Sequence, residues 1–274
     1  MRLGVLLAGE GVGAMGTIGV LRALAHKGIG VHAVCGMGSG AYPAALWACG
    51  YSAEAMEERA RALAAKGKRL LDWDGTGVLT GHGDALIQGR RVARLLLEHT
   101  QGLALRDCGQ RVAFVCMAVP SRRTVVFSPN VQPQDQAVWT DHAPIWFAAR
   151  AALGAPPLLR AANFIGIPLC AHPDVREGVR ALYRLGATHV AAVYPNYVRS
   201  VPKTPFDLSA WEASVALERA LVHVNRIRVD LPEYIAPLGF AEIPDCIHAG
   251  ERAGETAECG DFTEGAGKVL TLRR

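Results

Sequence analysis

The chain has 274 residues, of which 50% are hydrophobic and 20% charged, so it is long enough to bury one large core. Its formal net charge is only +4, and Lys and Arg are scattered along the chain, which argues against nucleic-acid binding. Because the sequence contains no apolar run of 18 residues and starts directly with a strand-like segment, we expect neither a membrane span nor a secretory signal.

The cysteines point to a reducing compartment. There are 7 of them, an odd number, and their spacing shows no pairs. Cys35, Cys49 and Cys116 lie in apolar runs, where a cysteine usually acts as a small core residue. We therefore expect a cytoplasmic protein whose cysteines stay reduced.

Apolar strands alternate with helical periods along the chain, a pattern that predicts an α/β fold with a mainly parallel sheet. The strands that we predict cover residues 2–8, 31–35, 112–119, 124–127, 165–169 and 189–194. The predicted helices cover residues 17–26, 41–49, 52–68, 84–100, 143–153, 175–185, 208–227 and 247–253. Ser52 is expected to cap the third of these helices, and residues 69–83 to form a loop. We expect one domain over residues 1–255 and a polar, glycine-rich tail over residues 256–274.

The run Gly-Met-Gly-Ser-Gly at residues 36–40 joins a predicted strand to a predicted helix of small residues. Two outer glycines around a tight strand-to-helix turn are typical of a nucleophile elbow, which presents a catalytic serine at its central position. Here the central residue is Gly38. The sequence therefore predicts the turn that would carry a catalytic serine, without the serine.

The glycine-rich loop after the first strand allows a different interpretation. Residues 9–14 satisfy the dinucleotide-binding pattern G-x-G-x-x-[GA] between a strand and a helix. That class of site also needs an acidic residue about 20 positions later, at the end of the second strand, to bind the ribose. Residues 34–37 occupy that place and include no acid, so we expect no nucleotide cofactor.

Seven collinear stretches together resemble the patatin-like phospholipase family. They are residues 7–24, 36–52, 79–99, 125–128, 149–157, 185–193 and 245–255. The first is similar to that family's oxyanion loop, here formed by Gly9, Glu10, Gly11, Val12 and Gly13, followed by its first helix. The resemblance implies a three-layer α/β/α sandwich with a mainly parallel central sheet.

The same resemblance implies an activity whose two central residues are missing here. The family hydrolyses acyl esters of lipids with a serine on the elbow and an aspartate from a distant Asp-Gly-Gly/Ala segment. Gly38 stands in place of the serine, and aligning outward from residues 185–187 puts Cys170 in place of the aspartate. Gly38 cannot form an acyl-enzyme, and a thiol with an ordinary pKa near 8.5 is a poor substitute for a carboxylate.

The oxyanion loop is altered as well. Glu10 replaces the family's second glycine, and Gly13 replaces its arginine. If Glu10 points inward, its negative charge would raise the barrier by at least the roughly 3–4 kcal/mol that one oxyanion donor supplies. If it points to solvent, it has no such effect, and the sequence leaves both orientations open.

Three residues could substitute for the missing dyad. Ser39 follows the elbow centre, but we expect it to be only a small residue at the start of the next helix. Asp174 is expected at the N-terminus of a helix, where the helix dipole favours an acid. His172 could pair with Cys170 or Ser39, although a lone loop histidine is more often structural. The Cys-Ala-His spacing at residues 170–172 is not a metal signature, so we expect no metal site.

The sequence therefore favours a patatin-like protein that has lost acyl-ester hydrolysis and binds a lipid or a protein partner, with peripheral membrane contact as an option. The alternative is a serine acyl hydrolase that uses Ser39 with Asp174 or His172. A set of aromatic residues could line an acyl-sized groove, but we expect most of them in the core, where such residues more often lie. They are Tyr42, Trp47, Tyr51, Trp73, Trp139, Trp146 and Phe147.

Overall fold

The structure is a computed structural model that describes residues 1–74, 85–132, 136–197 and 202–257. Its centre is a nine-stranded sheet with the strand order β5-β4-β3-β2-β1-β8-β9, and β7 and β6 branch from β3. The strands are β1 (Leu3–Leu7), β2 (Val31–Gly36), β3 (Val112–Ala118), β4 (Thr124–Phe127), β5 (Val138–Thr140), β6 (Ala162–Phe164), β7 (Ile167–Ala171), β8 (His189–Asn196) and β9 (Asn225–Asp230). The middle of the sheet, from β3 to β9, is parallel, whereas β4 and β7 run antiparallel to β3.

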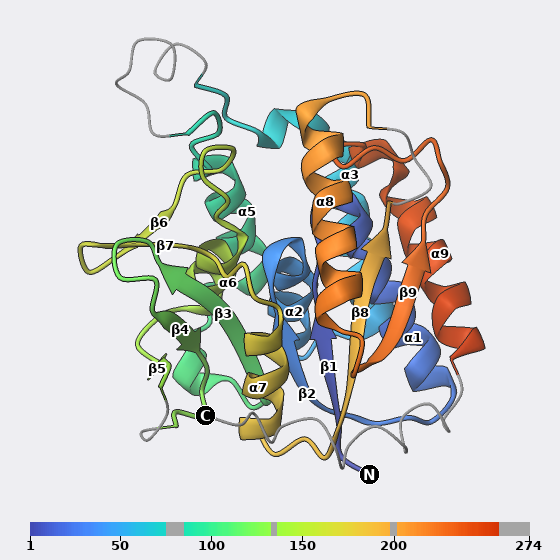
Figure 1. Cartoon of the computed structure of the whole chain (residues 1–274), viewed down its shortest axis with the longest axis horizontal. Helices are drawn as coiled ribbons and strands as arrows, with labels where there is room; N and C mark the ends of the chain where they lie inside the picture. The colour runs from blue at the N-terminus through green and yellow to red at the C-terminus, as the bar shows by residue number, and fades with distance from the viewer. Residues whose placement is uncertain (75–84, 133–135, 198–201, 258–274) are drawn as a thin grey trace.

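Helices cover both faces of this sheet (Figure 1). Those on one face are α1 (Gly16–His26), α2 (Ala41–Ala48), α3 (Ala53–Lys66), α5 (Arg90–Thr100), α6 (Ile145–Leu153) and α9 (Ile243–Thr256). The other face carries α7 (Arg176–Arg184) and α8 (Pro205–Ala220). The predicted three-layer α/β/α sandwich is therefore confirmed.

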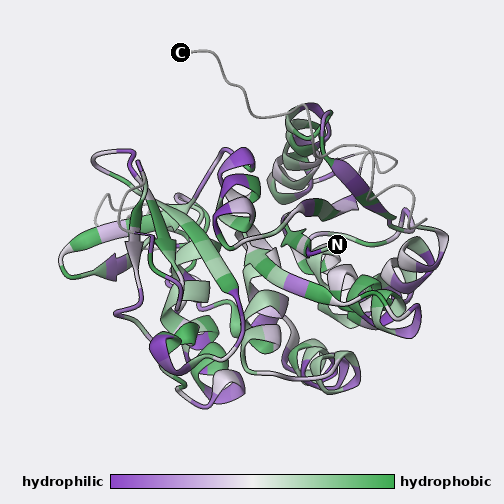
Figure 2. Ribbon diagram, turned by 90° about the horizontal axis from the view of Figure 1, so that it is seen from below, coloured by the Kyte–Doolittle hydropathy of each residue, from purple (hydrophilic) through white to green (hydrophobic). Residues whose placement is uncertain are grey.

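The central strands are buried on both faces because their residues alternate between two cores. In β1, Leu3 and Val5 pack into the core under α1 and α9, while Leu6 packs into the core under α7. Viewed from below, the strands of the sheet are mostly hydrophobic and the outer sides of the helices mostly hydrophilic (Figure 2). A continuous apolar strand of this kind is typical of a parallel sheet covered by helices on both sides.

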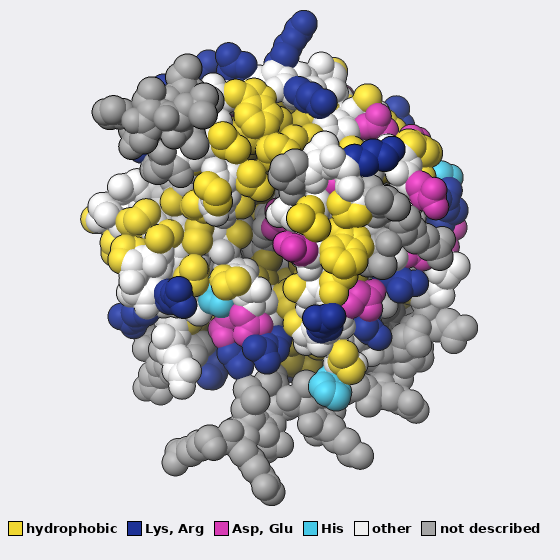
Figure 3. Space-filling view, turned by 45° about the horizontal axis from the view of Figure 1, so that its top comes forward, with side chains coloured by type: hydrophobic (Ala, Val, Ile, Leu, Met, Phe, Trp, Pro, Cys, Tyr) yellow, Lys and Arg dark blue, Asp and Glu magenta, His cyan; other side chains and the backbone are white. Residues whose placement is uncertain are grey.

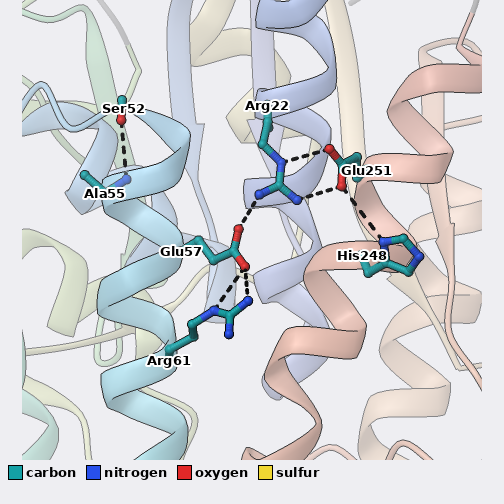
Figure 4. A network of polar contacts seen from close by, with 7 residues as sticks. All are labelled: Arg22, Ser52, Ala55, Glu57, Arg61, His248 and Glu251. Atoms are coloured by element: carbon teal, nitrogen blue, oxygen red, sulfur yellow. Dashed lines mark hydrogen bonds and ion pairs between the residues drawn. The ribbon is translucent and has the colours of Figure 1, made fainter.

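An arginine joins three helices on one face of the sheet (Figure 4). Arg22 of α1 donates to both carboxylate oxygens of Glu251 on α9, at 2.9 and 2.7 Å, and also to Glu57 on α3. Glu57 also accepts from Arg61, one turn along α3. The network fixes α1, α3 and α9 relative to one another.

The predicted N-cap of α3 is confirmed, because the Ser52 hydroxyl accepts a hydrogen bond from the Ala55 N–H at 3.3 Å (Figure 4). We expect Ser52→Ala to lower the free energy of unfolding by about 1 kcal/mol, since one helix N–H loses its partner. Urea denaturation would measure the change. Ser52→Asp is the control, since it keeps an acceptor and should retain the stability; equal losses in both variants would contradict the capping role.

Two predicted helix boundaries are wrong. The helix predicted at 84–100 begins at Arg90, and residue 84 lies outside the described residues, as does most of the predicted loop at 69–83. The Asp72 carboxylate accepts from the N–H groups of Gly89 and Arg90 at 2.8 and 2.9 Å and caps the helix there. The helix predicted at 208–227 runs from Pro205 to Ala220, and residues 225–230 instead form β9, paired with β8.

Two smaller differences concern the segments at 165–169 and 247–253. The extended run predicted at 165–169 contains the turn between β6 and β7, with a φ of 52° at Ile165. The short helix predicted at 247–253 extends over residues 243–256 as α9.

The predicted tail lies outside the described residues from position 258 onward, so the domain boundary at 255 stays a prediction. In the part of the chain that is described, no helix combines the length and hydrophobicity needed to cross a bilayer.

Candidate functional site

The elbow and the glycine-rich loop lie side by side at the carboxyl ends of two neighbouring parallel strands. β1 and β2 pair in parallel, with Leu7 opposite Gly36, and each then leads into a short 3-10 helix, η1 (Val12–Met15) or η2 (Gly38–Gly40). The elbow turns back tightly on β1: the Met37 N–H donates to the Leu7 carbonyl at 2.9 Å. A Cβ on Gly40 would lie 2.2 Å from that same carbonyl oxygen, so only glycine fits there.

Gly38 stands at the centre of this turn and faces the side chain of Glu10. Its φ is +55°, a left-handed conformation that glycine adopts without strain. A Cβ added to Gly38 would lie 2.7 Å from the Gly9 carbonyl oxygen and 2.9 Å from Oε1 of Glu10. The carboxylate therefore occupies the space in front of the elbow, and of the two orientations left open by the sequence the structure shows the inward one.

Glu10 lines two cavities, and its carboxyl lies beside Gly38, which lines the second of them. Within the described residues, it has no hydrogen-bond or ion-pair partner. Although part of the residue is open to the cavities, burial raises the pKa of Glu10 to about 7. A carboxyl of this kind is easily protonated near neutral pH and costs free energy when it is ionised.

Three backbone donors near the elbow and in the glycine-rich loop are already engaged within the chain. The residue after the elbow centre is the usual donor in such turns; here the Ser39 N–H donates to the Gly9 carbonyl at 2.8 Å. In the glycine-rich loop, the Val12 N–H donates to the Pro237 carbonyl at 2.8 Å, and the Gly13 N–H donates to the Tyr197 hydroxyl at 2.9 Å. These N–H groups therefore stabilise the protein's own fold, and they are not directed at a ligand.

Tyr197 and Pro237 were not singled out from the sequence. The Tyr197 hydroxyl also donates to the Glu10 carbonyl at 3.2 Å, so these two distant segments hold the loop from outside. No local pattern marks either residue, because their contacts depend on β8 and the segment before α9 folding against β1. The close fit of the loop is visible at Gly11, where a Cβ would lie 2.5 Å from the Pro237 carbonyl oxygen.

The second cavity shows what stands opposite Gly38. It is lined by Ala171 and His172, and Cys170 is not among its lining residues. Burial raises the pKa of the Cys170 thiol, which keeps that thiol protonated. Cys170 does not line this cavity, and Ala171 has no carboxylate. The family's aspartate therefore has no equivalent at Cys170 or Ala171.

His172 and Asp174 are held in local structural contacts. The His172 imidazole lies 3.1 Å from the Thr124 hydroxyl through Nε2 and accepts from the Asp174 N–H at 3.1 Å through Nδ1. The Asp174 carboxylate forms a bidentate pair with Arg176, with both N–O distances 2.8 Å, just before α7 begins. Asp174 thus lies at the N-terminus of a helix, and it is paired with an arginine.

Among the described contacts, Ser39 forms no hydrogen bond with either proposed partner. It lines the first cavity, whereas His172 lines the second and Asp174 lines neither. The structure therefore does not bring the three substitute residues together. In the part of the chain that the structure describes, no group of three or more His, Cys, Asp or Glu side chains could hold a metal ion.

The first cavity is an apolar groove of about 190 Å³ between α5, α6 and α8. This exceeds the roughly 150 Å³ of an engineered apolar cavity that binds benzene. Figure 3 shows hydrophobic side chains gathered around a hollow on this face of the molecule. Its lining includes Val12, Met15, Leu63, Leu70, Ile87, Val92, Leu95, Leu96, Leu153, Leu158, Leu159, Phe206, Leu238 and Phe240. The polar groups of the lining are few, so the site is suited to a hydrocarbon chain.

Of the aromatic residues considered from the sequence, only Tyr42 lines this groove. Its hydroxyl lies 2.9 Å from Nδ1 of His99, a buried pair at the side of the cavity. Trp73 is 49% exposed and packs edge-on against Phe206, at a ring-centroid distance of 5.8 Å. The others pack mainly in the two cores, so the core interpretation of these aromatics holds for most of them.

Comparisons with known proteins place this geometry in a family. The chain resembles the solved structure of the type III effector protein ExoU, with 15% identity, a TM-score of 0.40, and coverage of 95% of this chain and 53% of ExoU. It thus spans about half the length of that protein. No curated protein matches the chain. The family model described as patatin-like phospholipase matches residues 5–187, about two thirds of the sequence. The chain therefore belongs to the patatin-like phospholipase family.

Proposed function

We propose that this protein binds a long-chain acyl lipid or related amphiphile in the apolar groove and does not hydrolyse it. The observation that carries the proposal is the state of the elbow: Gly38 has no side chain, and the Glu10 carboxylate fills the space before it. Removing one oxyanion donor typically costs about 3–4 kcal/mol of transition-state stabilisation. Here the N–H of Ser39 is bonded within the chain, and a carboxylate adds unfavourable charge.

The alternative, a hydrolase that uses Ser39, lacks the geometry that it needs. A serine nucleophile requires a base within about 2.6–3.2 Å. The two candidate bases lie elsewhere, His172 in the second cavity and Asp174 in its pair with Arg176. A binding role in the cytoplasm also agrees with the cysteines, since the six that are described are all free.

The binding proposal can be tested by calorimetric titration with 1-decanol, a neutral amphiphile without a hydrolysable bond. Ser209 is an exposed residue of α8 that lines the groove, so Ser209→Trp should narrow the groove and weaken binding at least tenfold. Glu212→Trp is the control, because Glu212 is exposed on the same helix and lines no described cavity. If the wild-type protein gives no binding heat, or if both variants bind equally, the groove is not the binding site.

Restoring the serine alone should not restore hydrolysis. We expect Gly38→Ser to hydrolyse p-nitrophenyl decanoate no more than about tenfold faster than the wild-type protein, because the Ser39 N–H stays bonded to the Gly9 carbonyl and the Glu10 carboxylate occupies the space that the reacting ester would need. Gly38→Ala carries the same added Cβ and serves as the control. Strong turnover that appears with serine but not with alanine would show that the elbow still works as an active site.

A further inference from the structure

Glu10 adds an acidic residue to the lining of an otherwise mostly apolar groove. Glu10 is the one charged residue in the described lining of the groove, and its carboxyl lies beside Gly38, which lines the second cavity. The lining residues of both cavities include no lysine or arginine within the described chain. Nor does any described group bind the carboxyl. An enclosed carboxylate without a positive partner is unfavourable, so a ligand that brings a positive charge would relieve it.

We propose that the groove selects a long-chain amphiphile with a protonated primary amine, its alkyl chain against the apolar lining and its ammonium group on the Glu10 carboxylate. This inference rests on the proposed binding function and names the ligand class for that same site. An ammonium group supplies three N–H donors and one positive charge, which together satisfy a carboxylate. Ser39 also lines the groove, and its hydroxyl is a further acceptor for an ammonium group.

The other head groups fit this end of the groove less well. A fatty-acid carboxylate would bring a second negative charge close to Glu10, and like charges at short range repel. An alcohol could donate one hydrogen bond but would leave the charge uncompensated. We therefore expect the affinity order amine, alcohol, carboxylate for chains of equal length.

The groups facing Glu10 do not supply the missing charge. Burial lowers the pKa of His172, across the second cavity, so its imidazole is neutral at pH 8. The Tyr197 hydroxyl, which contacts the Glu10 backbone carbonyl, has its pKa raised by burial and is neutral as well. Since the Glu10 pKa is raised only to about 7, the carboxyl is mostly ionised at pH 8.

The experiment compares decylamine, 1-decanol and decanoate by calorimetric titration at pH 8, each below its micelle concentration, on the wild-type protein and on Glu10→Gln. We expect decylamine to bind the wild-type protein at least tenfold more tightly than 1-decanol. In Glu10→Gln this preference should disappear, because decylamine binding weakens at least tenfold, and decanoate binding should strengthen.

The outcomes separate this inference from the proposed function. If 1-decanol binds but decylamine binds no more tightly, or if the amine preference survives in Glu10→Gln, the amine-binding inference is wrong and the groove still binds chains. If none of the three amphiphiles binds the wild-type protein, both proposals are wrong. Glu10→Gln removes only a charge, so a folded variant is expected, and a cooperative urea denaturation curve would show that it is folded.

Discussion

Glu10→Gln is expected to stabilise the protein, and to do so far more at pH 8 than at pH 5. The folded-state pKa of Glu10 is about 7, raised from its usual 4.5 by burial. The favourable contribution of a raised carboxyl is therefore complete below pH 4.5 and is lost as the pH rises from 4.5 to 7. With 1.36 kcal/mol per pKa unit, the gain from glutamine should be about 2 to 3 kcal/mol larger at pH 8 than at pH 5.

Urea denaturation of both proteins at the two pH values measures this difference. The expected difference of about 2 to 3 kcal/mol is an upper value, because solvent in the two cavities screens part of the Glu10 charge. His172 and Tyr197, which face Glu10, stay neutral at pH 8 and so do not offset the effect. Glu233→Gln is the control, since Glu233 is an exposed side chain and should give little change at either pH. An equal gain from Glu10→Gln at both pH values would show that Glu10 is not buried at the elbow.

Gly250→Ala is expected to lower the free energy of unfolding by about 3 kcal/mol or more. A Cβ at this position of α9 would lie 1.8 Å from the Gly16 carbonyl oxygen at the start of α1. Gly19 shows the reciprocal fit, since its Cβ would lie 1.9 Å from the Ile247 carbonyl oxygen. The two backbones therefore touch, and a methyl group between them forces the helices apart.

Thermal or urea denaturation would measure the loss. Gly30→Ala is the matched control, because a Cβ there meets no atom within 4 Å and its φ is not positive. A Gly250→Ala protein as stable as Gly30→Ala would contradict the close α1–α9 contact.

The contact between α1 and α9 also bears on how far the fold extends along the chain. The family match ends at residue 187, whereas α9 packs into the same core as α1.

The parts of the fold that could be predicted are those whose sequence pattern is strong. β1 and β8 were found because their residues are almost all apolar, as strands buried on both faces require. β9 was missed although its sequence, Asn-Arg-Ile-Arg-Val-Asp, alternates polar and apolar residues as a strand does, because the predicted helix was extended across the turn at residues 221–224. The start of α5 was misplaced because the cap comes from Asp72, 17 residues before Gly89, which no local pattern reveals.

The candidate site was only partly predictable. The positions of Gly38 and Glu10 followed from the order of residues in the elbow and the loop. The inward orientation of Glu10 did not, because it depends on Tyr197 and Pro237, which hold the loop from distant segments. The separation of Ser39 from His172 likewise depends on the direction in which successive residues of the turn point, which only the folded backbone determines.

The central claim, that the elbow carries no working nucleophile, is tested most directly by intact-protein mass spectrometry after incubation with a fluorophosphonate probe. The account predicts that the wild-type protein gains no phosphonyl adduct under conditions that fully label an active serine hydrolase. A stoichiometric adduct that disappears in Ser39→Ala would contradict it and would establish Ser39 as a nucleophile.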